Sequence, residues 1–250
     1  KRYKTTITLL RFLLFAGFLI LWEAAARLGW IEAFIFSSPT RIAKCFYKMV
    51  MDGSIFKHTA ITLGETFLSF GIIIVFGIGA ALLLWLYTPL SDVLEPYLVV
   101  LNSLPKSALA PMLIVWLGNN AKAIIVTAVS VAIFGTVLNI YTSFADTDPD
   151  KIKLMKTFGG NRFQILTELV LPASLNSIRS NMKVNIGLCL VGVIIGEFLA
   201  ARAGLGYLII YNSQIFSMDP IAMSIIILCI ISIILFKIID LLQKIAKKLS

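Results

Sequence analysis

The segment ITLGETFLSFGIIIVFGIGAALLLWLY, residues 61–87, contains a single charged side chain, that of Glu65. An α-helix needs about 20 mainly apolar residues to cross a hydrocarbon layer of about 30 Å. The segment is longer than that and consists mostly of apolar residues. It therefore predicts a helix that spans a membrane.

Similar apolar runs occur five more times along the chain. They cover residues 7–28, 93–117, 123–144, 178–201 and 221–239, and prolines at 105 and 111 interrupt the second of them. Hydrophobic residues make up 59% of the chain and charged residues 14%, whereas soluble domains have about 25% charged residues. We expect an all-α polytopic membrane protein with six transmembrane helices, and this excludes a soluble domain.

The positions of Lys and Arg predict how the chain is oriented. Six spans place both termini on one side, and with the termini inside that side carries about twice as many Lys and Arg as the other. Both termini are therefore expected in the cytoplasm. The net charge of +9 is typical of cytoplasmic loops beside anionic headgroups, so we expect contact with the lipid bilayer and none with nucleic acid.

Two parts of the chain differ in character. Residues 1–60 are expected to form the N-terminal transmembrane helix and an outer amphipathic segment, which would begin at Ser38-Pro39-Thr40. Glu23 and Arg27, four residues apart, are expected to pair. Residues 61–250 are expected to form the core, with a hydrophilic loop at residues 146–175.

The 146–175 loop has a dense set of helix start and stop signals. Asp148 can cap a helix that begins at Pro149 and ends at Phe158, because Gly159-Gly160 favours a sharp corner. Asn161 and Gln164 have the spacing of a capping box, which predicts a second helix that ends near residues 171–172. Two short helices at a glycine corner form either a rigid knob that transmits force or a hairpin that rests on lipid headgroups.

The loop also resembles a known family. Gly159, nine residues and then Leu169-Val170-Leu171-Pro172 are similar to the Gly-x9-Ile-x-Leu-Pro half of the loop signature of ABC importer permeases. Lys153-Leu154-Met155 stands where the family has Glu-Ala-Ala. Further stretches look like the nitrate, sulfonate and taurine branch of that family; they are Ser38-Pro39-Thr40, the run from Leu104 to Pro111, Trp116-Leu117-Gly118, Gly196-Glu197-Phe198 and the run from Gly204 to Leu208.

The resemblance implies a type I ABC importer permease fold in the bacterial cytoplasmic membrane. It also implies two cytoplasmic ATPase subunits that bind ATP and Mg²⁺, an extracellular substrate-binding protein and a second permease copy, normally as a homodimer. The loop would be the coupling helix, and its ATPase-contacting residues would be Lys153, Leu154, Met155, Lys156, Phe158, Gly159, Gly160, Leu169, Leu171 and Pro172. This chain has no Gly-Lys pair and so no phosphate-binding loop of its own.

Polar residues inside the spans are candidates for the translocation path, because an ionisable group at that depth costs about 2.5 to 3.5 kcal/mol. Lys106 follows Pro105, where a broken helix could open a polar cavity. Glu197 follows Gly196, which lies four residues after Gly192, and this spacing of small residues lets two helices approach closely. Either Lys106 and Glu197 line the path, or they only fix a helix contact, because they pair with each other or because Lys106 snorkels. Asn102, Asn181 and Asn185 either line the same path or hydrogen-bond between helices.

Three classes of function remain to be separated. The leading one is an importer permease that moves a small, anionic solute of the sulfonate, taurine or nitrate type and performs no catalysis. The alternative is a self-sufficient secondary transporter in which Glu197 carries a coupling proton. A membrane enzyme is disfavoured, because no paired carboxylates, metal cluster or nucleophile with a base is evident, and no cofactor or metal is expected in this chain.

Overall fold

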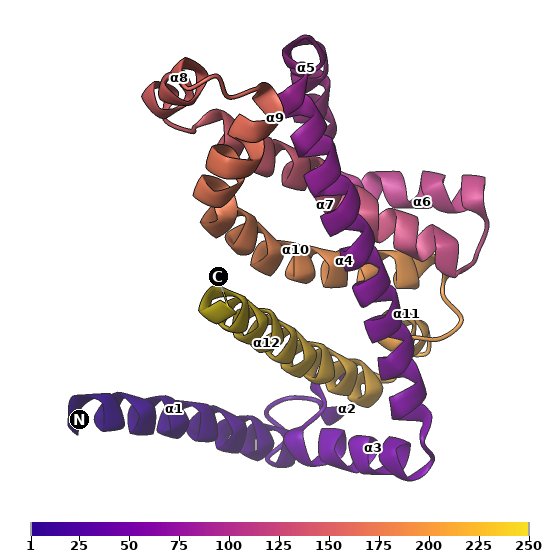
Figure 1. Ribbon diagram of the computed structural model, residues 1–250. Coiled ribbons are helices and arrows are strands. Elements are labelled where there is room, and N and C mark those ends of the chain that lie inside the picture. The colour runs from indigo at the N-terminus through magenta and orange to yellow at the C-terminus, as the bar shows by residue number, and fades with distance from the viewer. Residues whose placement is uncertain (1, 250) are drawn as a thin grey trace.

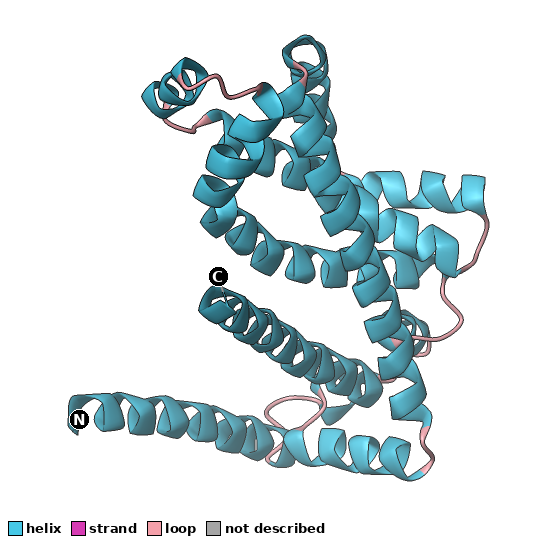
Figure 2. Ribbon diagram, viewed as in Figure 1, coloured by secondary structure: helices cyan, strands magenta, loops and turns pink. Residues whose placement is uncertain are grey.

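A computed structural model describes residues 2–249 of the chain; Lys1, part of the basic N-terminal start, and Ser250 lie outside them. The described residues form helices and contain no strand (Figures 1 and 2). In chain order the helices are α1 Arg2–Arg27, α2 Ala33–Phe36, α3 Pro39–Met51, α4 Ser54–Leu86, α5 Thr88–Ser103, α6 Lys106–Leu117, α7 Ala121–Ala145, α8 Pro149–Thr157, α9 Arg162–Ile165, the π turn η1 Leu166–Val170, α10 Leu171–Ala200, α11 Leu205–Gln214 and α12 Met218–Leu249.

Five of the described helices are long and apolar enough to cross a membrane. They correspond to the predicted spans in α1, α4, α7, α10 and α12. The sixth predicted span is the pair α5 and α6, which is bent by 97°. Leu104 is extended between them, with φ −64° and ψ 141°, because a residue before proline avoids the helical conformation. Pro111, in contrast, lies inside α6 and does not end it.

The centre of the molecule is the packing of α4, α7 and α10, which glycines bring close together. A Cβ on Gly192 of α10 would lie 2.6 Å from the Cα of Ala128 in α7, and one on Gly196 would lie 2.9 Å from the Cα of Ile124. Gly77 brings α4 equally near to Thr136. Small residues at this spacing allow two backbones to approach within a membrane, as the sequence predicted for Gly192 and Gly196.

The helix predicted to end near residues 171–172 does not end there. α9, η1 and α10 follow one another without a break from Arg162 to Ala200. Pro172 has no N–H to continue the regular pattern, and the π turn before it absorbs the defect, because the N–H of Leu171 donates to the carbonyl of Leu166 one residue further back. The 146–175 loop therefore consists of one separate short helix and the first turns of a long curved one (Figure 1).

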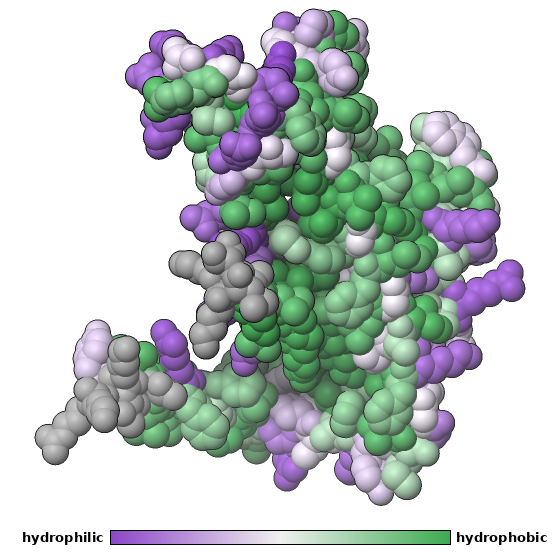
Figure 3. Space-filling view, viewed as in Figure 1, coloured by the Kyte–Doolittle hydropathy of each residue, from purple (hydrophilic) through white to green (hydrophobic). Residues whose placement is uncertain are grey.

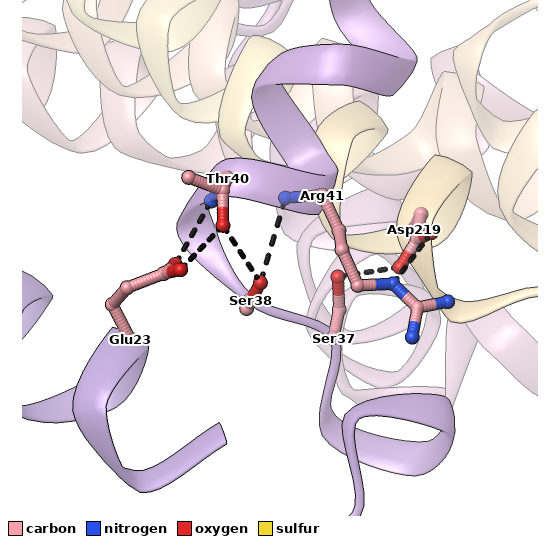
Figure 4. A network of polar contacts seen from close by, with 6 residues as sticks. All are labelled: Glu23, Ser37, Ser38, Thr40, Arg41 and Asp219. Carbon is pink, nitrogen blue, oxygen red and sulfur yellow. Dashed lines mark hydrogen bonds and ion pairs between the residues drawn. The ribbon is translucent and has the colours of Figure 1, made fainter. Parts of the chain in front are cut away.

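A polar network at the end of the molecule opposite α8 ties the N-terminal segment to α12 (Figure 4). Glu23 accepts hydrogen bonds from Arg27 at 2.7 Å, which confirms the predicted pair, and from the backbone N–H of Thr40 at 3.1 Å. Asp219 of α12 accepts from the Ser37 hydroxyl at 2.7 Å and pairs with Arg41 at 3.0 Å. The network fixes both ends of the turn that leads into α3.

α3 is the predicted amphipathic helix, and α4 follows it after a short turn. The hydroxyl of Ser38 accepts from the N–H of Arg41 at 3.4 Å and caps α3. Asp52 accepts from the N–H of Ser54 at 2.9 Å at the start of α4, and its hydrogen bonds with Ser54 lower the pKa of its carboxyl. The predicted domain boundary at residue 60 falls inside α4.

The surface shows how the molecule fits a bilayer. Figure 3 shows hydrophobic side chains along the body of the molecule, with hydrophilic ones around α8 and α9 at its upper end and others along its right and lower edges. α1 projects away from the rest (Figure 1), and its apolar window is 0% buried. Because an apolar helix surface is stable only when lipid or protein covers it, α1 requires a membrane or a partner chain.

Candidate functional site

The 146–175 loop begins with α8, whose ends form as the sequence predicted. The side chain of Asp148 accepts from the N–H of Asp150 at 2.9 Å, and Pro149 occupies the first turn. Gly159 has a φ of +80°, a conformation in which residues with a Cβ are strained. The capping box of Asn161 and Gln164 is present, with both of its hydrogen bonds at 2.8 Å.

One face of this loop is apolar and exposed. Leu154 is 55% exposed, Phe158 79% and Phe163 64%. The opposite face holds α8 against the body, since Ile152 and Met155 pack on the buried cluster formed by the ends of α4 and α7 and by residues 165–178. Large exposed apolar side chains on a polar end of a molecule mark a surface for protein contact.

The other predicted ATPase-contacting residues occupy different positions. Lys153 is exposed and pairs with Asp150 at 3.1 Å, and Lys156 is exposed near the corner. Leu169 and Leu171 are partly buried and pack against the cluster beneath the loop, whereas Pro172 is exposed. The exposed members of the predicted set are thus Lys153, Leu154, Lys156, Phe158, Gly159 and Pro172. Met155, Leu169 and Leu171 instead pack on the cluster beneath the loop.

A polar cleft lies between α7 and α10 beside the loop. It has a volume of about 720 Å³. Asn181 lines it and accepts a hydrogen bond from the side-chain amide of Asn139 at 3.3 Å. Asn185, one turn further along α10, is 2% exposed, and its Nδ2 has no hydrogen-bond partner among residues 2–249. The cleft is lined by Asn139, Thr142, Ser143, Asp146, Thr147, Asp148, Lys151, Leu169, Ala173, Ser174, Asn176, Ser177, Ser180 and Asn181.

Lys106 and Asn102 meet at the corner between α5 and α6. The Lys106 ammonium donates to the backbone carbonyl of Asn102, a carbonyl near the end of α5, where the helix leaves its last acceptors free. Lys106 is exposed. No ion pair joins it to Glu197 within residues 2–249, so the pairing considered from the sequence does not occur there.

Glu197 is fully buried and holds the turn between α10 and α11. Its carboxylate accepts from the Thr62 hydroxyl at 2.7 Å and from the N–H of Gly206 at 2.6 Å. The side chain of Glu65 on α4 is also buried and lies beside it. Gly204 has a φ of +124°, and a Cβ there would lie 2.4 Å from the Glu197 carboxyl.

Thr62, Glu65 and His58 were not among the residues chosen from the sequence. All three lie on α4, more than 130 positions before Glu197 in the chain, and His58 Nδ1 accepts from the N–H of Gly204 at 3.0 Å. The one available signal was the period of the helix, since residues 58, 62 and 65 share a face. No group of His, Cys, Asp or Glu in the described part of the chain could hold a metal ion.

Comparison with known families and proteins adds to this geometry. Residues 73–248 match the family model described as the binding-protein-dependent transport system inner membrane component. A probable ABC transporter permease protein of Haemophilus influenzae is 31% identical over 94% of this chain and 95% of its own length. A riboflavin transport system permease protein of Chloroflexus aurantiacus is 27% identical over 90% and 84%. A putative aliphatic sulfonates transport permease protein of Bacillus subtilis is 23% identical over 88% and 79%.

Solved structures show the same fold. The methionine ABC transporter MetNI, in an inward-facing conformation, has a chain that superposes with a TM-score of 0.68 at 17% identity, covering 80% of this chain and 98% of that one. A chain of a bacterial ABC transporter involved in the import of alginate gives a TM-score of 0.65 at 13% identity and covers 97% and 94%.

Proposed function

The chain belongs to the family of binding-protein-dependent transport system inner membrane components, and from this we propose that it moves a small, anionic solute inward as the permease subunit of an ABC importer. The type I ABC importer permease fold expected from the sequence is confirmed. We propose that the chain itself performs no catalysis. ATP hydrolysis with Mg²⁺ then takes place in two partner ATPase subunits.

The observation that carries the coupling role is the exposed apolar face of the 146–175 loop. Phe158 and Phe163 would insert into a groove of the ATPase, and Lys153 and Lys156 would orient the docking by charge. Ile152 and Met155 join this face to the membrane helices. Displacement of the docked loop would therefore move α10, because the loop and α10 are one helix from Arg162 onward.

Solute passage would follow the polar side chains described above. The cleft beside Asn181 offers amide and hydroxyl donors to an anion, and the start of α6 presents Lys106 together with the positive end of the helix. The path would also include Asn102, Asn185 and Glu197. The similarity to a sulfonate permease supports an anionic oxygen-rich solute.

The assembly and its location follow from the same proposal. We place the chain in the cytoplasmic membrane of a bacterium, with both termini in the cytoplasm, residues 61–250 as the transport core and residues 1–60 as its N-terminal helix and outer segment. A second copy of the chain would complete the path, and an extracellular binding protein would deliver the solute. The uncovered α1 has the exposed surface that such an assembly would bury.

The test is reconstitution of the permease in liposomes with its co-expressed ATPase and binding protein. We expect uptake of taurine, an alkanesulfonate or nitrate only when the ATPase and ATP are both present, with riboflavin as the comparison solute. Uptake of riboflavin alone would disprove the anionic solute and leave the importer. Uptake by the permease without any ATPase, driven by a pH gradient, would instead establish a secondary transporter.

A further inference from the structure

One side chain connects the start of α9 to the end of α4. Arg162 Nη2 donates to the backbone carbonyl of Trp85 at 2.8 Å and to the hydroxyl of Thr88 at 2.6 Å. The guanidinium carbon also lies 5.6 Å from the centre of the Trp85 ring, within the range of a cation–π contact. A single guanidinium of α9 thus contacts two other elements, α4 and α5.

The contacts fall where α4 needs a partner. α4 ends at Leu86, so the carbonyl of Trp85 is among the last four carbonyls of the helix. These carbonyls accept no hydrogen bond from an N–H of the same helix. A cation at this end is also favoured by the helix dipole. α5 begins at Thr88, and Tyr87 alone separates it from the end of α4. Arg162 therefore holds both sides of the corner between the two helices.

The charged residues of α8 make no comparable contact. Lys153 pairs with Asp150, and Lys151 with Asp148 at 4.0 Å, in both cases within the loop itself. Apolar contacts beside the arginine involve Ile165 and Leu166, which pack in the same cluster as Trp85. Apolar packing has no preferred direction, whereas the two hydrogen bonds of Arg162 Nη2 hold the guanidinium in a defined position between Trp85 and Thr88.

We propose that Arg162 is the positioning residue that transmits movement of the 146–175 loop to the corner of α4 and α5. The inference rests on the proposed function. When the ATPases displace the loop, α10 moves because it is continuous with it, and α4 and α5 move because Arg162 holds their corner. Without Arg162, the loop and α10 would still move, but the displacement of the α4–α5 corner would be smaller.

The experiment measures the two movements separately and needs no transported solute. In a chain whose three cysteines are replaced, a spin label is placed at Thr157 on the loop or at Val93 on α5, both of which are exposed. The distance between labels in the two permease copies is measured in the complex with its ATPase, in liposomes. Each sample is compared without nucleotide and after trapping with ATP and vanadate.

The native arginine should give a nucleotide-dependent distance change at both positions. In Arg162→Ala the change at Thr157 should persist, while the change at Val93 should fall to less than half. Arg162→Lys should restore part of the change at Val93, since an ammonium can still donate to the carbonyl. Arg202→Ala, which removes the same charge from an exposed position on the α10–α11 turn, should alter neither change.

Two results would overturn the proposal. One is an undiminished change at Val93 in Arg162→Ala, and the other is an equal loss at both positions, which a purely structural role predicts. If Arg162→Ala fails to assemble, Thr88→Val tests the proposal instead, because it removes one acceptor and leaves the arginine in place. A nucleotide-dependent distance change at Val93 as large as in the native chain would then reject the proposal. A native complex with no nucleotide-dependent change at Thr157 would reject the importer function itself.

Discussion

At the scale of single residues, glycine contacts set how closely the central helices pack. A Cβ on Gly192 would meet backbone atoms of Ala128 rather than a flexible side chain. The backbone cannot give way without moving α7, so the helices must separate.

We therefore expect Gly192→Ala to lower stability by about 1–3 kcal/mol, measured by thermal unfolding of the purified protein in detergent. Gly64→Ala is the matched control, because nothing lies within 4 Å of the Cβ it adds, and alanine is about 0.5–1 kcal/mol better than glycine in a helix. Equal losses in the two variants would show that close approach of α7 and α10 is not required.

Glu197 provides a second prediction at this scale. Its removal in Glu197→Leu leaves the N–H of Gly206 buried without its acceptor and leaves the hydroxyl of Thr62 with the carbonyl of His58 at 3.3 Å. A buried donor without an acceptor costs about 1–3 kcal/mol. The melting temperature should fall, whereas Glu95→Leu, at an exposed position in α5, should have little effect. A stable Glu197→Leu protein would mean that the turn at Gly204 is held by other contacts.

Substitution of Lys106 tests whether the transported solute is an anion. Lys106→Met removes the only cation at the corner of α5 and α6 within residues 88–117, so uptake of an anion should fall several-fold while assembly with the ATPase stays near normal. Co-purification and uptake are measured on the same preparation. Parallel losses of assembly and uptake would instead assign Lys106 to the capping of α5 that it already performs at Asn102.

At the scale of elements, the corner after α8 depends on backbone conformation alone. Nothing lies within 4 Å of a Cβ added to Gly159, but its φ of +80° costs a residue with a Cβ about 1–2 kcal/mol. Gly159→Val should therefore insert normally and lose ATPase binding and uptake. Gly159→Asn, which tolerates this conformation, should retain both, and uptake equal to that of the native chain in the valine variant would contradict the role of the corner.

The element scale also shows what could be read from sequence. The caps of α8 and α9 were predictable because Asp148, Asn161 and Gln164 bond to residues two or three positions away. The end of the second helix was predicted wrongly, because Pro172 signals a break and the compensating π turn has no local signal. The partners of Glu197 and Arg162 were missed because they depend on which helices pack together.

At the scale of the whole molecule, composition and the apolar runs were sufficient for the fold class. The spans followed from length and hydropathy, and the break at Leu104 followed from proline chemistry. Their arrangement in space did not follow, since six similar apolar helices can pack in many ways. The close contacts of α7 and α10 at Gly192 were the exception, because the spacing of small residues marks an interface.

Topology gives the prediction at this scale. With six crossings, a fluorescent protein fused to the C-terminus should fold and fluoresce in the cytoplasm. In a cysteine-free background, Arg202→Cys should react with a membrane-impermeant maleimide in intact cells, and Thr157→Cys only after permeabilisation. Labelling of Thr157→Cys in intact cells would reverse the orientation and place the loop where no ATPase can reach it.

The 39 residues from Arg162 to Ala200 form one unbroken helix, about 58 Å long at 1.5 Å per residue. Its first turn lies in the loop, and its last turn carries Glu197, which accepts a hydrogen bond from the N–H of Gly206 at the opposite end of the helix. An antibody fragment that immobilises residues 201–206 from outside the cell would therefore slow nucleotide turnover in the cytoplasm. The importer could in that way be silenced by a molecule that never crosses the membrane.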